Sequence, residues 1–204
     1  GLLGQLTVQL LKASGCRVVC LDVDNHRVEL ARKLGADLAL KASEDNLNDE
    51  IQHWVGNHGV DATIIAASTS SDTVVQQAME ITRKKGRVVV VGSVGMGLKR
   101  SPFYEKEIDF LISCSYGPGR YDLTYEKQGQ DYPYAYVRWT ENRNMQEYLR
   151  LVSEGFVELS AILEREYSLD QVQEAYAVLQ LSSERPLGVL LRYSVNADET
   201  TASK

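Results

Sequence analysis

Residues 1–23, GLLGQLTVQLLKASGCRVVCLDV, decide the fold because they join a glycine pair, a helix and a strand. Gly1 and Gly4 have the G-x-x-G spacing that closes the longer pattern G-x-G-x-x-G. A helical repeat follows and stops at Gly15; its predicted buried face is Leu2, Leu3, Leu6, Val8, Leu10 and Leu11. The apolar run 16–23 predicts a strand covered on both faces. Because a strand normally precedes these glycines, we expect the chain to be a piece of a longer protein.

Strand-like and helix-like segments alternate through the first 116 residues. The predicted strands are 16–23, 37–42, 60–68, 87–95 and 109–117, and the predicted helices are 25–36, 43–57 and 70–86. Ser43, with acidic Glu44 and Asp45 behind it, is the predicted cap of helix 43–57. Such alternation requires right-handed crossovers and parallel strands. The predicted fold class is therefore α/β, a doubly wound parallel sheet of the Rossmann type that lacks its first strand in this chain.

The missing first strand has a structural consequence. In the dinucleotide-binding fold that strand is central, within the order 3-2-1-4-5-6. We therefore expect two half-sheets with a vacant position between strands 16–23 and 60–68, which should not pair directly. Either another segment fills this position or the domain is only marginally stable.

The sequence changes character after residue 116. Residues 117–144 have no sustained period and form a predicted aromatic-rich loop, long enough to suggest a functional segment. Helices are predicted over 144–157 and over 168–180, the latter capped by Ser168, and a closing strand over 187–193 could pair across subunits or return to another domain. We expect a dinucleotide-binding domain over 1–116, the loop over 117–144, the C-terminal helices and strand over 145–193, and a tail or linker over 194–204.

Composition and charge exclude several classes of protein. The net charge of −6 argues against sequence-independent nucleic-acid binding, which needs a basic face. No apolar run reaches the ~20 residues of a membrane span, and the first residues lack a signal-peptide pattern. The cysteines, Cys16, Cys20 and Cys114, are sparse and odd in number, which favours a reducing compartment. We expect a cytoplasmic protein without a nucleic-acid or membrane partner.

Asp22 strengthens the nucleotide interpretation of the glycine pair. It lies 18 residues after Gly4, at the end of a predicted strand, where a carboxylate binds ribose hydroxyls. A carboxylate there repels a 2′-phosphate, so NAD is favoured over NADP. Arg27 weakens this preference, although we expect it on the helix surface, and Asp24 is the predicted cap of helix 25–36. An S-adenosylmethionine-dependent methyltransferase is the less favoured alternative, because the predicted sheet is regular and parallel.

Three segments carry a family resemblance: residues 1–37, the run GVDATIIAAS and the run KKGRVVVVGSVG. They resemble the cofactor domain of medium-chain dehydrogenases/reductases, the zinc-type alcohol, sorbitol and threonine dehydrogenase superfamily. The pattern R-x-x-x-A-x-x-x-G-A-D, which begins at Arg27, is typical of it. Residues 103–145 resemble a threonine-dehydrogenase-like subgroup that occurs in two-part oxidoreductases. The resemblance covers residues 1–193.

The resemblance implies an activity and a set of cofactor contacts. The family transfers a hydride to or from a carbon that bears oxygen, here an alcohol or carbonyl carbon, with a sugar or sugar derivative as one substrate class. The implied contacts with NAD(H) are Gly1, Leu2, Leu3, Gly4, Asp22, Arg27, Ala67, Ser68, Val91, Gly92, Ser93, Cys114, Ser115 and Tyr116. Most of these positions follow predicted strands, where open parallel sheets bind ligands on general grounds.

The sequence nominates no catalytic or metal-binding residue. In the family that it resembles, the zinc ligands lie mostly in a GroES-like domain that precedes the cofactor domain and is absent here. Cys16 and Cys20 are expected to face a core, and His53 and His58 to have surface or capping roles. We therefore expect zinc only outside this chain, covalent neighbouring domains, and no catalysis by this fragment alone; a homo-oligomer is left open.

The loop 117–144 and its flanks are rich in aromatic and arginine residues. They include Tyr116, Tyr121, Tyr125, Tyr132, Tyr134, Tyr136 and Trp139, with Arg120 and Arg138 among them. The rings could stack on a sugar while the arginines bind hydroxyls or carboxylates. The favoured alternative is a surface that packs on a neighbouring domain or subunit. A nucleic-acid stacking surface is disfavoured by the acidic charge.

Two functions of different kinds remain open from the sequence. The favoured one is the NAD(H)-binding domain of an oxidoreductase with a small-molecule substrate. The other is a non-catalytic nucleotide-binding or assembly module that uses the aromatic loop for a partner.

Overall fold

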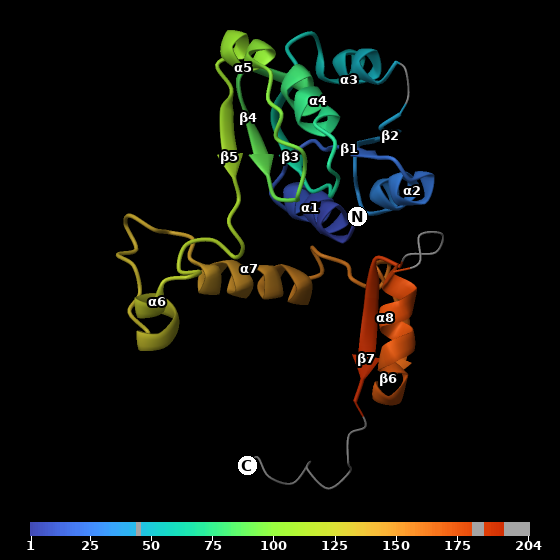
Figure 1. The fold of residues 1–204 in the computed structure, drawn as a ribbon, viewed down its shortest axis with the longest axis vertical. Coiled ribbons are helices and arrows are strands. Elements are labelled where there is room, and N and C mark those ends of the chain that lie inside the picture. The colour runs from blue at the N-terminus through green and yellow to red at the C-terminus, as the bar shows by residue number, and fades with distance from the viewer. Residues whose placement is uncertain (44–45, 181–185, 194–204) are drawn as a thin grey trace, which may run out of the picture. The chain divides into compact units, whose positions relative to one another are not determined.

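The computed structural model describes residues 1–43, 46–180 and 186–193. The elements in chain order are α1 (Leu2–Ala13), β1 (Val19–Asp22), α2 (Asn25–Lys33), β2 (Leu38–Lys41), α3 (Leu47–Val55), β3 (Val60–Ile65), α4 (Thr73–Ile81), β4 (Thr82–Val90), α5 (Arg100–Lys106), β5 (Asp109–Ile112), α6 (Leu123–Gln128), α7 (Glu141–Ser153), β6 (Leu163–Ser168), η1 (Leu169–Gln171), α8 (Val172–Gln180) and β7 (Gly188–Arg192) (Figure 1).

Contacts divide the chain into two units. One comprises Gly1 and Leu3–Val157, and the other Leu2 and Glu158–Lys204. The finer division at residues 116, 144 and 193 remains a prediction. Among residues 1–43, 46–180 and 186–193, none of the helices has the length and apolar character that a membrane span requires.

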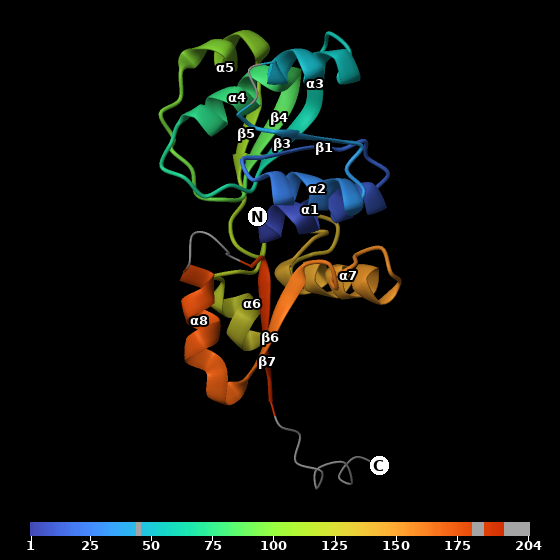
Figure 2. The same ribbon diagram turned by 90° about the vertical axis from the view of Figure 1, so that its right-hand side faces the viewer.

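The strands of the first unit form two separate parallel sheets (Figures 1 and 2). β1 pairs with β2, and β4 lies between β3 and β5, all in parallel register. β1 and β3 do not pair, and within the described ranges no strand lies between them. The predicted α/β fold of two parallel half-sheets is confirmed, as is the absence of direct pairing between these strands.

Apolar side chains explain how the helices cover these sheets. Val75 and Met79 of α4 are buried against Val88 and Val90 of β4. A second cluster, centred on Ile51 of α3, joins side chains of β1 and β2 to Val60 of β3; its other members are Val19, Leu21, Leu38, Leu40, Leu47, Val55 and Ile81. Each fully buried side chain of this size contributes roughly 1.5–3 kcal/mol. The two half-sheets therefore share a core even though their strands do not pair.

The first helix forms as predicted, but of its predicted buried face only Val8 is fully buried. Its buried residues are Gln5, Val8 and Gln9, whereas Leu2 is 39% and Leu3 is 51% exposed, and the remaining leucines of the predicted face are partly exposed. A helix covers its apolar stripe only where another element packs against it. Since no described strand lies between the half-sheets, the prediction of a fully buried leucine face is wrong.

Several boundaries also differ from the predictions. The N-cap of α3 is Asn46, so the predicted cap at Ser43 is wrong; Glu44 and Asp45 lie outside the described residues. Thr82 begins β4, although residues 82–86 were expected to continue the preceding helix. Its hydroxyl lies 2.7 Å from that of Thr63 and donates to the carbonyl of Ala78, so tertiary contacts fix the strand start. The predicted strand 16–23 is shorter, with Cys16 exposed before β1.

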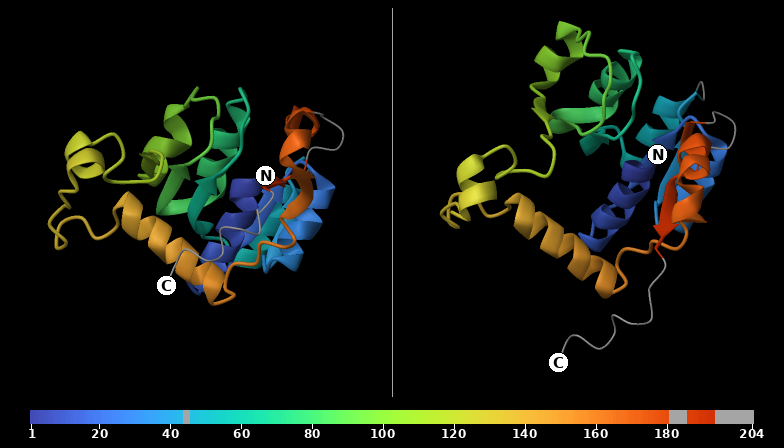
Figure 3. Two further views of the ribbon diagram at one scale, coloured as in Figure 1. Left: turned by 90° about the horizontal axis from the view of Figure 1, so that it is seen from below. Right: turned by 60° about the horizontal axis from the view of Figure 1, so that its bottom comes forward.

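The second unit is built around two parallel strands and a helix. β6 pairs with β7, and α8 packs on this pair (Figures 1 and 3). Ser168 is the N-cap of η1, as predicted, and Oε1 of Gln171 accepts its backbone N–H at 3.2 Å. The predicted strand 187–193 therefore pairs within its own chain, with a strand that the sequence analysis missed. The predicted tail 194–204 lies outside the described residues.

Candidate functional site

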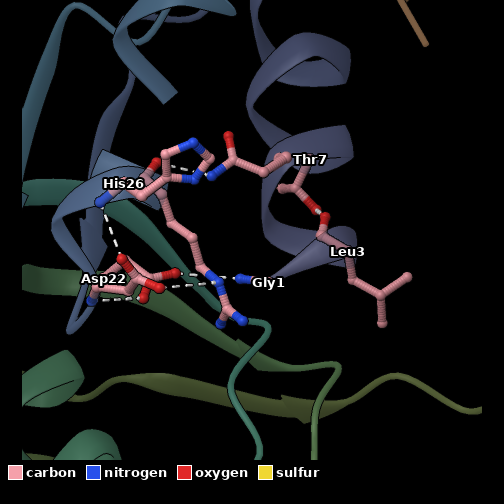
Figure 4. Close-up of polar contacts among 8 residues, drawn as sticks. Gly1, Leu3, Thr7, Asp22 and His26 are labelled. Carbon is pink, nitrogen blue, oxygen red and sulfur yellow. Dashed lines mark hydrogen bonds and ion pairs between the residues drawn. The ribbon is translucent and has the colours of Figure 1, made fainter. Parts of the chain in front are cut away.

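The start of α1 and the end of β1 meet at a carboxylate (Figure 4). The backbone nitrogen of Gly1 donates to Oδ2 of Asp22 at 3.1 Å, and the Asp22 side chain is 12% exposed. The other oxygen, Oδ1, accepts the backbone N–H of Asp24 at 3.1 Å. The Asp22 carboxylate thus contacts the beginnings of α1 and α2, and the predicted site residues Gly1 and Asp22 lie together.

The first turn of α2 completes this corner. Asp24 is the N-cap of α2, as predicted, and its side chain accepts the backbone N–H of His26 at 2.8 Å. Arg27 lies with Nε 3.7 Å from Oδ2 of Asp24, and its Nη1 would be 3.9 Å from a Cβ atom added to Gly1. Its side chain is 25% exposed, so Arg27 is partly buried at this corner.

The N-terminus of α1 fits a phosphate-bearing ligand. No side chain in the described part of the chain caps it, and its first turn contains no acidic residue. The first intrahelical bond runs from the N–H of Gln5 to the carbonyl of Gly1, which leaves the N–H groups of Leu2, Leu3 and Gly4 without an intrahelical partner. Such N–H groups and the positive end of the helix dipole attract anions. Anion-binding donors therefore lie beside the carboxylate of Asp22.

Gln5 is a site residue that the sequence analysis missed. It is 1% exposed, and its Nε2 donates to the carbonyl of Arg27 at 2.8 Å, which connects α1 to α2. Among the described residues, its buried Oε1 has no hydrogen-bond partner. The available signal was two glutamines, Gln5 and Gln9, four residues apart in a helix otherwise rich in leucine.

The carboxyl ends of β3 and β4 form a second group of predicted site residues. Ser68 and Ser93 form an isolated parallel bridge, and the N–H of Ser93 donates to the carbonyl of Ala67 at 3.0 Å. A Cβ atom on Gly92 would lie 2.0 Å from that same carbonyl oxygen, so only glycine permits this approach. The structure therefore brings together the predicted residues Ala67, Ser68, Val91, Gly92 and Ser93.

The loop after β4 also contacts the start of α4. Oδ1 of Asp72 accepts the N–H of Gly97 at 2.8 Å. Cβ atoms on Gly95 and Gly97 would each lie 2.3 Å from a carboxylate oxygen of Asp72. The glycines after β4 thus allow its loop to pack closely on the loop after β3, a contact that the sequence analysis did not identify.

The third group of predicted residues follows β5. The N–H of Ser113 donates to the carbonyl of Val90 at 2.8 Å, which places the start of this turn beside the end of β4. Cys114 is exposed, Ser115 has a positive φ of 46°, and the Tyr116 carbonyl accepts from Nδ2 of Asn144 at 3.0 Å. These residues are tied partly to β4 and partly to α7. Their role as cofactor contacts, like that of the other predicted site residues, remains a prediction.

The described part of the chain offers no metal site. It contains no group of three or more histidine, cysteine, aspartate or glutamate side chains placed to hold an ion. Cys20 is partly buried and packs on the core of α2, and its burial, with the negative charge of Asp22, raises the pKa of its thiol. Because these residues do not fit a zinc ion, no chemical step is assigned to zinc in this chain.

The aromatic segment 117–144 is ordered by polar contacts and contains regular structure, contrary to the prediction of an irregular loop. Asp122 caps the short helix α6 through the N–H of Thr124. The rings of Tyr125 and Tyr132 are stacked with centroids 5.5 Å apart, and Tyr132 donates to Asp122. This bond, followed by the backbone donors, holds the pKa of the Asp122 carboxyl below its usual value. Other aromatic side chains remain exposed, among them Tyr121, Tyr134, Tyr136 and Trp139.

Comparison with known proteins identifies relatives of this chain. The sequence model of the family described as zinc-binding dehydrogenase matches residues 3–127. An alcohol dehydrogenase of Cupriavidus necator is 26% identical over 161 residues, which cover 78% of this chain and 38% of that protein. The chain therefore spans well under two thirds of the length of this curated relative.

Solved structures share the fold of this chain. A short chain alcohol dehydrogenase of Escherichia coli CFT073, complexed with the cofactor NADH, has a TM-score of 0.70 and 19% identity over 94% of this chain and 49% of its own. L-Idonate 5-dehydrogenase of Escherichia coli K-12 has a TM-score of 0.70 and 21% identity, with 94% of this chain and 48% of its own covered. At these identities the structures support the fold.

Proposed function

The chain belongs to the zinc-binding dehydrogenase family, and from that membership we propose that it is the NAD(H)-binding part of an oxidoreductase. The observation that carries the proposal is the position of the Asp22 carboxylate, 3.1 Å from the backbone nitrogen of Gly1 at the start of α1. A dinucleotide needs these two features together: helix N–H groups for its pyrophosphate and a carboxylate for its ribose hydroxyls.

The residues of this chain would bind and orient the cofactor. The N–H groups at the start of α1 would hold the pyrophosphate, and Asp22, fixed by Asp24, would accept hydrogen bonds from the adenosine ribose. The loops at Ser68 and Ser93 follow parallel strands, at the edge where open α/β sheets bind ligands. When bound, NAD(H) supplies the hydride donor or acceptor. The chain's own contribution is to hold the cofactor in place.

The same proposal covers the class of substrate, the source of any zinc ion and the cellular location of the protein. The relatives include alcohol dehydrogenases and an idonate dehydrogenase, which supports a hydride transfer at an alcohol or carbonyl carbon, with sugar-type molecules as one class. Any zinc and the catalytic residues would come from another domain of the same protein. A cytoplasmic location agrees with three free cysteines.

Calorimetric titration with NADH tests the proposal. Asp22→Asn removes the charge that accepts from the ribose, so we expect NADH to bind on the order of tenfold more weakly or worse. Asp49→Asn, at an exposed position in the first turn of α3, is the matched control and should bind NADH like the unmodified protein. Equal NADH affinity in all three proteins would rule out this site.

A further inference from the structure

A hollow beside α7 is lined mainly by arginine and aromatic side chains. Its volume is about 370 Å³, and its lining includes Arg138, Arg143, Arg150, Glu147, Tyr134 and Trp139. Three arginines thus face one glutamate, on a chain whose net charge is −6. The volume lies in the range of small-molecule sites. None of the residues predicted to contact NAD(H) lines it.

Two of the three arginines are fully committed to partners in the protein. Nη1 of Arg143 donates to Asp131 at 2.6 Å, and its Nε donates to the carbonyl of Arg138 at 2.8 Å. Arg150 forms ion pairs with Glu147 at 2.7 Å and with Glu154. These pairs neutralise both cations and hold the wall of the hollow in place. Arg143 also fixes the backbone of Arg138.

Arg138 differs from these neighbours. Its guanidinium carbon lies 4.1 Å from the ring centroid of Trp139 and 4.9 Å from that of Tyr134. Among the described residues, no carboxylate lies within ion-pair distance of its guanidinium, and the charge of Glu147 acts on it only from a longer distance. A guanidinium stacked on aromatic rings keeps its N–H donors in its own plane, free to bind two oxygens at once.

We propose that this hollow binds a small organic anion through its carboxylate or phosphate group. Arg138 supplies the paired N–H donors, and the exposed parts of the Trp139 and Tyr134 rings contact the carbon skeleton of the ligand. Trp139 is 45% and Tyr134 is 58% exposed, which leaves ring surface for that contact. The proposal goes beyond the NAD(H) site and does not depend on it.

The protein carries a built-in reporter for this test. It contains two tryptophans, Trp139 in the hollow and Trp54, which lies under Arg17 in another part of the first unit. Trp54→Phe therefore makes the fluorescence specific to Trp139. In this background we would titrate gluconate, glucose 6-phosphate and inorganic phosphate, with glucose as the uncharged probe. We expect saturable fluorescence changes with gluconate or glucose 6-phosphate, weaker binding of inorganic phosphate, and none with glucose.

Variants of two arginines then locate the binding. Arg138→Gln should weaken binding of the organic anion about tenfold or more. Arg100→Gln is the matched control, because Arg100 is also exposed and stacked on a ring, 4.2 Å from the centroid of Tyr104, but lies outside the hollow. It should bind like the parent. Far-ultraviolet circular dichroism and thermal unfolding verify that each variant is folded.

Salt provides a test that needs no variant. Because an exposed charge pair is screened by salt, binding of the preferred anion should weaken as sodium chloride is raised. No saturable change up to about 10 mM of any anionic probe would overturn the proposal. Equal binding by glucose, or an unchanged affinity in Arg138→Gln, would also overturn it. The carboxylate and phosphate probes together show which anionic group is preferred.

Discussion

The backbone nitrogen of Gly1 lies 3.1 Å from Oδ2 of Asp22, which joins the start of α1 to the end of β1. Oδ1 of the same side chain accepts the N–H of Asp24 at 3.1 Å, at the start of α2. The carboxylate is therefore fixed from two sides before any ligand arrives. A fixed acceptor loses less conformational entropy on binding than a mobile one, which favours a preorganised ribose site.

Gly1→Ala should weaken the binding of NADH and leave the stability of the fold nearly unchanged. A Cβ at this position would meet only the Arg27 guanidinium, at 3.9 Å, so we expect the free energy of unfolding to change by no more than about 1 kcal/mol. NADH should nevertheless bind on the order of tenfold more weakly, because the backbone must approach the pyrophosphate closely. Titration calorimetry measures this. Thr7→Ala, further along α1, is the control and should leave NADH affinity unchanged; equal affinity in Gly1→Ala would contradict the prediction.

Gly92→Ala should destabilise the fold. Its Cβ would lie 2.0 Å from the carbonyl oxygen of Ala67, so one of the two loops must move. Overpacking of this kind costs about 1–3 kcal/mol, measured as the free energy of unfolding in urea. The control is Gly4→Ala, where a Cβ has no neighbour within 4 Å. Its free energy of unfolding should be unchanged or higher by up to about 1 kcal/mol. If Gly92→Ala proves as stable as the parent, the close contact between the loops is wrong.

Asp37→Ala should remove a pH-dependent part of the stability. Hydrogen bonds from Lys12 and then from the backbone N–H of Val18 lower the pKa of the Asp37 carboxyl. A carboxyl whose pKa is lower when folded stabilises the protein above its unfolded pKa of about 3.9, and this contribution disappears as the pH falls through the folded value. The variant should therefore melt below the parent at pH 7, with the difference shrinking below about pH 4.

The size of this effect also follows from the contacts of Asp37. Because its side chain is 33% exposed and solvent screens the pair with Lys12, we expect the bonds from Lys12 and Val18 together to contribute about 1 kcal/mol at pH 7. Asp61→Ala, which removes an exposed ion pair with Arg83, should lower the melting temperature less. A difference between parent and Asp37→Ala that stays constant from pH 7 to about pH 2 would contradict the assignment.

Lys106→Met should weaken the end of α4. Nζ of Lys106 donates to the carbonyls of Met79, Glu80 and Thr82, where the helix leaves carbonyls unpaired. Partial burial lowers the pKa of this amine. We expect a loss of about 1.5–3 kcal/mol in urea unfolding, whereas exposed Lys99→Met should change stability by under about 0.5 kcal/mol. Equal stability of the two variants would refute the capping role.

Local patterns predicted the parallel architecture and much of the candidate site. The run before Asp22 is apolar enough for a buried strand, so the carboxylate was expected at its end, near the start of α1. Ser68 and Ser93 were also predicted at strand ends, and the structure pairs them. The carboxyl ends of neighbouring parallel strands lie at the same edge of a sheet. Asp24 and Ser168 were recognised as caps because capping is a local interaction.

The errors arise where distant contacts outweigh local preference. Thr82 follows a helical pattern, but its hydroxyl meets that of Thr63, nineteen residues away, and the chain begins a strand there. Gln5 is polar in a leucine-rich helix, yet it is buried because Arg27 offers it a carbonyl. The leucines of α1 follow a helical period, but a period does not state whether a strand lies opposite them. Contacts of this kind cannot be read from spacing alone.

The most direct test of the proposed NAD(H) site compares two cofactors on one protein. NADPH differs from NADH by a single 2′-phosphate, which the negative charge of Asp22 would repel. Titration calorimetry measures the affinity for each cofactor. We predict a dissociation constant for NADH well below about 1 mM and binding of NADPH at least about tenfold weaker. NADH affinity no tighter than millimolar, or equal affinity for both cofactors, would contradict the assignment of Asp22 as the ribose-binding carboxylate.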